Sequence, residues 1–135
     1  MQYVDADIFL RFLTRDDPAK AERVKELLER AERGEVALLT SESVIAELVF
    51  VLSSPKLYNL SRERIRALLV PIVSLRGLKI ASRSLLLAAL DVYATTPLDF
   101  VDALVGAHME ARQVTEVYSY DRHFDLVSGI RRLEP

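Results

Sequence analysis

Apolar residues in this chain alternate between short runs and longer stripes at helical spacing. The run at residues 2–5 favours a strand, and the apolar side chains between Ile8 and Leu13 then recur at intervals of three and four residues, as on one face of a helix. The clearest stripe runs from Ala21 to Ala31. The alternation continues to the end of the chain, and the predicted strands are residues 2–5, 35–40, 78–81, 115–120 and 130–133.

Polar residues that can cap a helix precede several of these stripes. Asp17 followed by Pro18 has the form of an N-cap and a first helical position. The corresponding positions before later stripes are held by Ser41 or Ser43, by Ser61 and by Asp99. Pro71 lies inside one apolar stripe, where it predicts a kink or an early end of that helix.

Strands that alternate with helices predict a parallel sheet covered by helices on both faces, with right-handed crossovers. The chain has 135 residues, of which 50% are hydrophobic, so one sizeable core is feasible and we expect a single α/β domain over residues 1–135. No stretch is apolar for the roughly 18–20 residues that a membrane span needs. The first residues lack the pattern of a secretory signal, and there is no cysteine. These features favour a cytoplasmic protein.

Charge is unevenly distributed along the chain. The formal net charge of −2 argues against a protein that coats nucleic acid through bulk positive potential. Residues 56–90, however, contain 7 basic residues and 1 acidic residue, a net charge of +6, whereas the segments on either side each carry −4. Two interpretations stay open for this segment: a solvated helix surface, or a rim that binds phosphate groups. The arginines concerned are Arg62, Arg64, Arg66 and Arg83.

Four acidic residues occupy positions where a parallel sheet places its sites, near the carboxyl ends of its strands. Asp5 ends the first predicted strand and Asp121 ends the fourth. Glu47 follows the second strand by about two helical turns, and Asp102 lies in the helix before the fourth. Clustered carboxylates raise one another's pKa unless a cation joins them. Because there is no cysteine and only 2 histidines are present, Mg²⁺ or Mn²⁺ suits such a site better than Zn²⁺.

Several polar residues have a structural interpretation that competes with a functional one. An unpaired Glu47 would be costly to bury among its apolar neighbours, and the edge of its helix is the alternative position. Asp99, three residues before Asp102, favours helix capping. His108 favours a structural role and Asp125 a solvated position. His123 lies two residues after Asp121 but is not expected to act in the chemistry.

Four segments resemble motifs of the PIN domains, a family of ribonucleases. Residues 3–13 (YVDADIFLRFL) are similar to the opening of these domains, in which an aspartate ends the first strand and a helix follows at once. Residues 41–48 (SESVIAEL) resemble the helix with its acidic glutamate, residues 99–104 (DFVDAL) the third acidic motif, and residues 119–125 (SYDRHFD) the fourth. No single motif is diagnostic, but the ordered set of four is fairly specific. The motif positions fall on Asp5, Glu47, Asp102 and Asp121.

The resemblance implies a PIN-like three-layer sandwich with a central parallel sheet of about five strands flanked by helices. It also implies a homodimer that hydrolyses RNA with one or two Mg²⁺ or Mn²⁺ ions, and the toxin of a VapBC-type pair that binds a small antitoxin protein. The four mapped acids would hold the metal, and Glu47 would orient or deprotonate the attacking water. The four arginines of the basic segment would contact RNA phosphates. Asp7 departs from the family pattern, which often has asparagine or another small polar residue there.

Other classes of protein share part of this pattern. Asp5-Ala6-Asp7 after a first strand also opens the haloacid-dehalogenase-like phosphatases, with Thr40 or Ser41 as a second motif. Those enzymes need a lysine late in the chain, and the last lysine here is Lys79. The receiver domains of response regulators also need a late lysine, so the chain does not match them either. A PIN-like module that binds RNA or protein without cutting is the remaining alternative, and the presence of all four acids counts against it.

The first and middle helices contain more apolar residues than one core face can cover. Residues 8–13 and 44–52 are apolar on several sides. Part of this surface is therefore expected to lie in a dimer or under an amphipathic helix from a small partner. Burial within one chain is the alternative.

Overall fold

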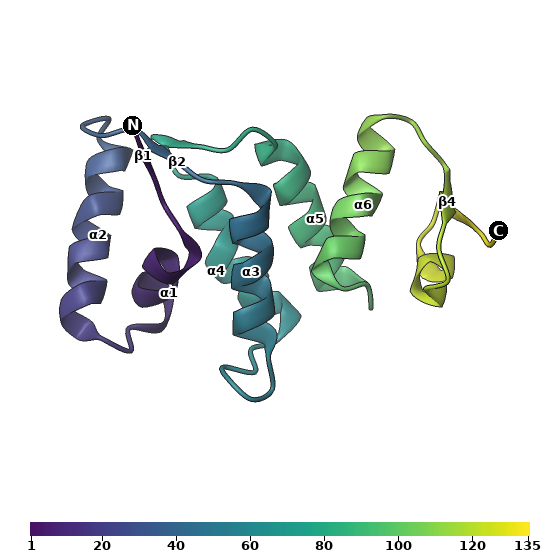
Figure 1. The fold of residues 1–135 in the computed structure, drawn as a ribbon, viewed down its shortest axis with the longest axis horizontal. Coiled ribbons are helices and arrows are strands. Elements are labelled where there is room, and N and C mark those ends of the chain that lie inside the picture. The colour runs from purple at the N-terminus through teal and green to yellow at the C-terminus, as the bar shows by residue number, and fades with distance from the viewer. The chain divides into compact units, whose positions relative to one another are not determined.

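The computed structural model describes residues 1–135 and contains six α-helices, one 3₁₀-helix and five short strands (Figure 1). The chain divides into two compact units, Met1–Arg83 and Ser84–Pro135, and each unit is described by itself. The expectation of a single domain over the whole chain stays a prediction. None of the helices is both long and apolar enough to cross a membrane.

Unit 1 combines a three-stranded parallel sheet with four helices. The strands lie in the order β1-β2-β3, with Tyr3 opposite Leu39 and Leu39 opposite Lys79. Its elements are β1 (Gln2–Tyr3), α1 (Ala6–Thr14), α2 (Pro18–Glu32), β2 (Leu38–Leu39), α3 (Glu42–Ser53), α4 (Arg62–Val73) and β3 (Leu78–Lys79). Far more residues of this unit lie in helices than in strands, since each strand is only two residues long.

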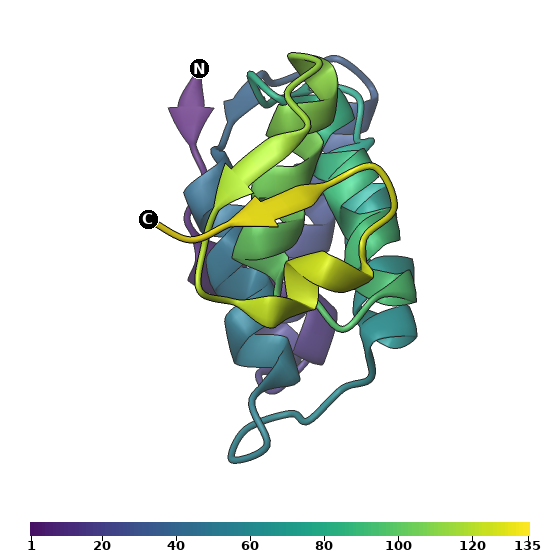
Figure 2. The ribbon, with the colours of Figure 1, turned by 90° about the vertical axis from the view of Figure 1, so that its right-hand side faces the viewer.

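Unit 2 contains two helices and a two-stranded parallel sheet. Figure 2 shows β4 and β5 side by side, with the 3₁₀-helix η1 in the connection between them. Its elements are α5 (Arg83–Thr95), which starts at the unit boundary, α6 (Phe100–Ala111), β4 (Glu116–Tyr118), η1 (Arg122–Leu126) and β5 (Arg131–Leu133). Phe124 anchors η1, because only 2% of its surface is exposed.

The α/β class and the parallel pairing are confirmed, whereas the single sheet of about five strands is wrong. Five strands do form, but they make one sheet of three and one of two. Each strand pairs over two or three residues, and β4 takes β5 as its hydrogen-bonded neighbour within unit 2. The sequence pattern identified the strands but could not fix their partners, because apolar alternation carries no information about which edges meet.

The predicted caps explain where most helices begin. The Asp17 carboxylate accepts a hydrogen bond from the backbone N–H of Lys20 (3.1 Å), and the Ser61 hydroxyl accepts one from Arg64 (3.1 Å). Ser41 is the N-cap residue of α3 without such a bond. Its hydroxyl instead accepts a bond from the Tyr3 hydroxyl at 2.6 Å.

Pro71 does not end α4 early, because the helix continues to Val73. Proline removes one backbone donor, whose acceptor would have been the carbonyl group four residues earlier, at Ala67. Both Pro71 and Ala67 are exposed, so water can satisfy that carbonyl. The loss of one bond near the end of the helix is therefore tolerated.

Gly77 allows the turn before β3 to pass directly against α2. Its φ of +83° is in the left-handed region, and a Cβ at this position would lie 2.2 Å from the carbonyl oxygen of Ala31. Residues with a side chain would collide with the helix backbone. The close approach carries β3 to its place beside β2.

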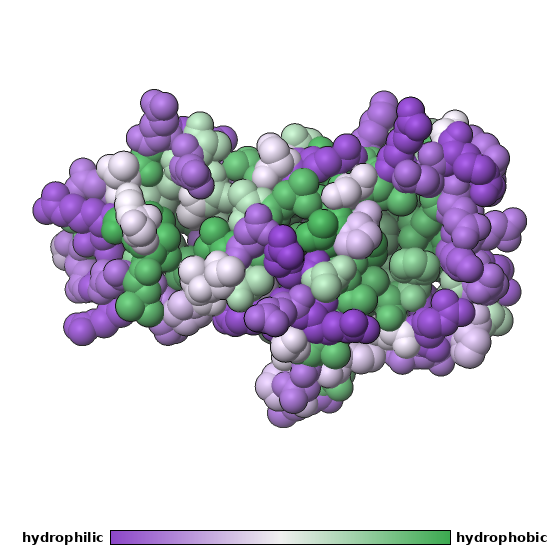
Figure 3. Space-filling view, turned by 180° about the vertical axis from the view of Figure 1, so that it is seen from behind, coloured by the Kyte–Doolittle hydropathy of each residue, from purple (hydrophilic) through white to green (hydrophobic).

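The apolar surplus of the first and middle helices is largely, but not wholly, buried. Phe9 is completely buried in α1, while Phe12 and Leu13 are half-buried. In α3 the apolar residue Phe50 is not buried, since it is 72% exposed. Figure 3 shows, on one face, hydrophobic residues at the surface among hydrophilic ones.

Candidate functional site

Asp5 lies directly after β1 and is the N-cap residue of α1. Its exposed carboxylate accepts a hydrogen bond from the backbone N–H of Ala6 at 2.8 Å. The preceding residue, Val4, is buried, and its N–H donates to the carbonyl oxygen of Leu39 at 2.8 Å. Strand pairing therefore fixes the backbone immediately before Asp5, and the capping bond fixes its carboxylate at the start of α1.

Thr40 joins the carboxyl ends of all three strands in unit 1. It is the only buried polar residue of the chain, at 3% exposure. Its hydroxyl donates to the carbonyl oxygen of Val4 at 2.9 Å, and its backbone N–H donates to that of Lys79 at 3.1 Å. Thr40 thus supports the strand end that carries Asp5. This role does not follow from the sequence, although Thr40 ends a predicted strand.

Glu47 lies on the exposed side of α3. The buried residues of this helix, among them Ile45, Leu48 and Leu52, face the core, whereas Glu47 and Phe50 are exposed. The carboxylate therefore avoids the cost of burial, as the helix-edge interpretation requires. An exposed acid on a helix that packs well is available to a ligand without being needed for the core.

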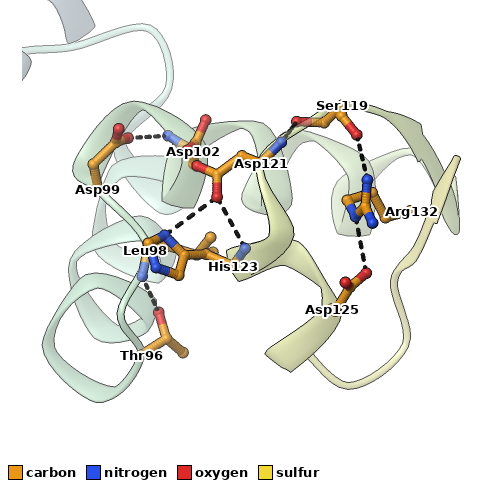
Figure 4. Close-up of polar contacts among 9 residues, drawn as sticks. All are labelled: Thr96, Leu98, Asp99, Asp102, Ser119, Asp121, His123, Asp125 and Arg132. Atoms are coloured by element: carbon orange, nitrogen blue, oxygen red, sulfur yellow. Dashed lines mark hydrogen bonds and ion pairs between the residues drawn. The ribbon is translucent and has the colours of Figure 1, made fainter. Parts of the chain in front are cut away.

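Asp99 and Asp102 occupy the start of α6. The Asp99 carboxylate accepts a hydrogen bond from the backbone N–H of Asp102 at 2.8 Å, which confirms the capping role predicted for Asp99. Asp102 itself is half-buried. Figure 4 shows the Asp102 side chain directed towards Asp121, which follows β4.

Asp121 caps η1 in the same way that Asp99 caps α6. Its carboxylate accepts a hydrogen bond from the backbone N–H of His123 at 2.9 Å, and Nδ1 of the His123 ring lies 3.2 Å from the same oxygen (Figure 4). The backbone N–H of Asp121 donates to the Ser119 hydroxyl at 3.0 Å. The backbone N–H and the carboxylate of Asp121 are therefore both fixed by local contacts. His123 lies beside the Asp121 carboxylate.

The Asp102 and Asp121 carboxyl groups interact with each other. Burial, the hydrogen bond to Asp121 and the nearby charge of Asp99 together raise the pKa of the Asp102 carboxyl to about 6. The N–H of His123 and the hydrogen bond from Asp102 lower the pKa of Asp121. Of the two carboxyl groups, Asp102 is therefore the one that takes up a proton first as the pH falls.

The chain matches the PIN domain family over residues 2–130, a range that extends through both units. The chain belongs to the PIN domain family. PIN domains are generally nucleases, so the chain has a nuclease-type fold. No curated protein matches the chain.

The four acids predicted as the PIN site are divided equally between the units. Asp5 and Glu47 belong to unit 1, and Asp102 and Asp121 to unit 2. The structure brings the second pair together, and in neither unit do three or more His, Asp or Glu side chains form a group that could hold a metal ion. The convergence of all four stays a prediction.

The donor set of the Asp102 and Asp121 pair nevertheless fits a divalent cation. Two neighbouring carboxylates repel each other when both are ionised, and a cation bound between them removes that repulsion. Their ligand atoms are oxygens, which suit Mg²⁺ or Mn²⁺.

The predicted RNA-binding arginines of this PIN domain differ in their surroundings. Arg64 and Arg66 are exposed on α4, whereas Arg62 is half-buried. Arg83 is half-buried as well, and its guanidinium group donates to the carbonyl oxygen of Leu78. Arg83 therefore has a structural contact besides any role in RNA binding.

Two further polar residues considered in the sequence, Asp125 and His108, make structural contacts. Asp125 accepts a hydrogen bond from Nε of Arg132 at 3.0 Å instead of being only solvated. His108 is half-buried on α6, with its Nδ1 2.9 Å from the Arg112 guanidinium group, in agreement with the structural role expected for it.

Proposed function

We propose that this protein is a metal-dependent endoribonuclease and the toxin component of a VapBC-type toxin-antitoxin pair. The observation that carries the nuclease proposal is the Asp102 and Asp121 pair, in which burial and a neighbouring carboxylate raise the pKa of Asp102 to about 6 within a PIN family member. A pair of this kind is costly to a protein unless it binds something positive.

Each acid has a distinct task in the proposed reaction. Asp102 and Asp121 would hold Mg²⁺ or Mn²⁺, and Asp5 would complete the ligand set from the end of β1. Glu47, exposed on α3, would orient the attacking water and accept its proton. A bound divalent cation would lower the pKa of water and stabilise negative charge on the leaving oxygen of the phosphodiester. The water oxygen would form a bond to phosphorus as the bond from phosphorus to the 3′-oxygen breaks, and the leaving 3′-oxygen would take up a proton to give a hydroxyl group.

RNA is the proposed substrate, and the basic segment its proposed phosphate contact. Arg62, Arg64 and Arg66 lie in the first two turns of α4. Their positive charge and the N-terminus of the helix would both favour a bound phosphate group. Arg83 is the fourth proposed contact.

The toxin role, the antitoxin partner, the homodimer and the cytoplasmic location rest on the motif resemblance. Phe50 is 72% exposed on α3, so its ring is available to an interface with another chain.

Amide substitutions of the acids test the nuclease proposal. We expect Asp5→Asn and Asp102→Asn each to reduce Mn²⁺-dependent cleavage of a single-stranded RNA by roughly 100-fold or more, without unfolding the protein. Chelation of the metal should abolish cleavage by the unsubstituted protein. Activity is measured by gel separation of the products, and folding by circular dichroism.

Asp17→Asn is the matched control, because Asp17 also caps a helix but follows no strand. It should retain full activity. Undiminished cleavage by Asp102→Asn would remove the acid pair from the site. Absence of metal-dependent cleavage by the unsubstituted protein would instead leave the non-catalytic binding module as the better interpretation.

A further inference from the structure

Arg132 is the most enclosed charged side chain of the C-terminal segment. It lies in β5, and only 11% of its side chain is exposed. Its Nε donates to the Asp125 carboxylate at 3.0 Å, and one terminal nitrogen donates to the carbonyl oxygen of Ser119 at 2.9 Å and to Glu134. The side chain therefore connects η1, the end of β4 and the residue after β5.

Ser119 is the residue through which this network reaches the acid pair. Its carbonyl oxygen is held by Arg132, and its N–H donates to the carbonyl oxygen of Leu133 at 3.0 Å. Its hydroxyl accepts the N–H of Asp121 at 3.0 Å. Figure 4 shows this continuous path from Asp125 through Arg132 and Ser119 to Asp121.

The planar guanidinium group suits this place better than any other cation. It offers several N–H donors in a fixed plane, so it can bind a carboxylate and a carbonyl oxygen at once. A lysine ammonium carries the same charge but lacks that geometry. Two neighbouring carboxylates raise the pKa of Arg132 above its ordinary value, so the group stays charged at every pH at which the protein is folded.

We propose that Arg132 is a positioning residue for Asp121: by holding Ser119 and Asp125 on the two sides of Asp121, it fixes the carboxylate where it meets Asp102. Asp125 and Ser119 lie in the two segments that leave and enter Asp121 along the chain. A clamp on both segments restricts rotation of the backbone between them. The effect on cleavage rests on the proposed nuclease function, whereas the effect on the Asp121 backbone does not.

Two readouts on three variants test this positioning role. Arg132→Ala and Arg132→Lys remove the planar group, and Arg131→Ala is the control, since Arg131 is the neighbouring arginine with a side chain 75% exposed. We expect both Arg132 variants to lower kcat for RNA cleavage by roughly 10- to 100-fold with little change in KM. Millimolar guanidinium ion should restore part of the rate of Arg132→Ala.

Hydrogen exchange provides the readout that does not need activity. The backbone N–H of Asp121 should exchange at least tenfold faster in Arg132→Ala and in Arg132→Lys, with α6 protected as before. Arg131→Ala should match the unsubstituted protein in both measurements. If Arg132→Ala does not fold, Asp125→Asn weakens the same clamp and should shift exchange and kcat in the same direction to a smaller extent.

The two proposals fail in different ways. Unchanged exchange at Asp121 and unchanged kcat in the folded Arg132 variants would overturn the positioning role. A protein that cleaves no RNA, but whose Asp121 exchange rises in the Arg132 variants, would overturn the nuclease function and retain the clamp.

Discussion

At the scale of single residues, the raised pKa of Asp102 implies a cost in stability. The proposed metal site needs the Asp102 carboxylate, which is the form that the metal-free folded protein disfavours. Its pKa of about 6 means that the folded protein favours the protonated form more than the unfolded chain does. The stabilising contribution of the proton is present at low pH and is lost as the pH rises through about 6. Above that pH the folded protein contains a partly buried carboxylate beside another one.

We therefore expect Asp102→Asn to stabilise the metal-free protein in a pH-dependent way. At pH 8 the variant should be more stable by about 1 kcal/mol, since solvent screening reduces the effect of a shift of this size at a half-exposed group. Near pH 4 the difference should be much smaller, because Asp102 is then protonated in the folded state and only about half ionised in the unfolded chain, where its pKa has the ordinary value of 3.8. Thermal unfolding in the presence of a chelator measures both values.

Added Mg²⁺ provides the complementary measurement. It should raise the melting temperature of the unsubstituted protein and leave that of Asp102→Asn nearly unchanged, because a ligand stabilises only the state that binds it. An equal stability difference at pH 4 and pH 8 would contradict the raised pKa.

The sequence predicted the residues that contact neighbours within a few positions along the chain. It did not predict the residues whose contacts lie far away along the chain. Asp17, Ser61 and Asp99 cap helices as predicted, because a cap involves atoms only three residues away. Arg132 and Thr40 act on residues 13 and 36 positions away along the chain. No spacing rule identifies such contacts, since they depend on which strands pair.

At the scale of elements, the contact between α2 and the turn before β3 depends on a missing side chain. We expect Gly77→Ala to destabilise the protein by about 2–4 kcal/mol, because the new methyl group would overlap the Ala31 carbonyl and the backbone would keep a left-handed φ. Denaturant unfolding measures the loss.

Gly34→Ala separates the two causes. Gly34 also has a positive φ, of +78°, but nothing lies within 4 Å of the position that a Cβ would take. This variant should lose only about 1 kcal/mol from backbone strain. Equal losses at the two positions would show that the close approach to α2 contributes nothing.

The arginines of α4 should act together as a phosphate contact. Replacement of Arg62, Arg64 and Arg66 by glutamine should weaken RNA binding by roughly tenfold or more at low salt and reduce the slope of log affinity against log salt by about 2. Fluorescence anisotropy with a labelled single-stranded RNA provides both numbers.

Two basic residues of unit 1 outside α4 serve as a control for that triple variant. Glutamine at Arg23 and Lys25, both on exposed positions of α2, should leave the slope nearly unchanged. A salt slope that is the same in the α4 variant and in the unsubstituted protein would return these arginines to a solvated helix surface.

The sequence predicted where the helices begin. For the strands it predicted the location along the chain but not the length. Five of the six helices begin within a few residues of the expected starts, because caps and apolar stripes are encoded locally. The strands are shorter than expected: residues 35–40 were predicted, and β2 contains only Leu38–Leu39. Strand length depends on the neighbour, so it could not be obtained from one segment alone.

At the scale of the whole molecule, a hydrophobic groove in unit 1 is the proposed seat of the antitoxin. It lies between α1, α2 and α4, has a volume of about 260 Å³, and is lined mainly by Phe12, Leu28, Ile72 and Leu75. Charged residues at its rim, such as Lys25 and Glu29, could pair with a helix whose apolar side fills the groove.

We expect the protein bound to the product of a neighbouring small gene to exchange amide hydrogens more slowly at residues 8–15 and 71–75, and to cleave RNA at least tenfold more slowly. Purification of the protein alone and with that product allows the comparison. Residues 103–107 of α6, which line no part of the groove, provide the internal control. Equal exchange and equal cleavage in both samples would reject the groove as the antitoxin site and leave the nuclease proposal intact.

The division of the chain into two contiguous units has a consequence for its synthesis. A ribosome completes Met1–Arg83 first, and this part contains its own sheet and core and can begin to fold while the rest is made. Asp5 and Glu47 are then present without Asp102 and Asp121. Under the proposed mechanism, a nascent chain on the ribosome, which is surrounded by RNA, cannot cut it. Competence for cleavage arrives only with the last segment to be translated.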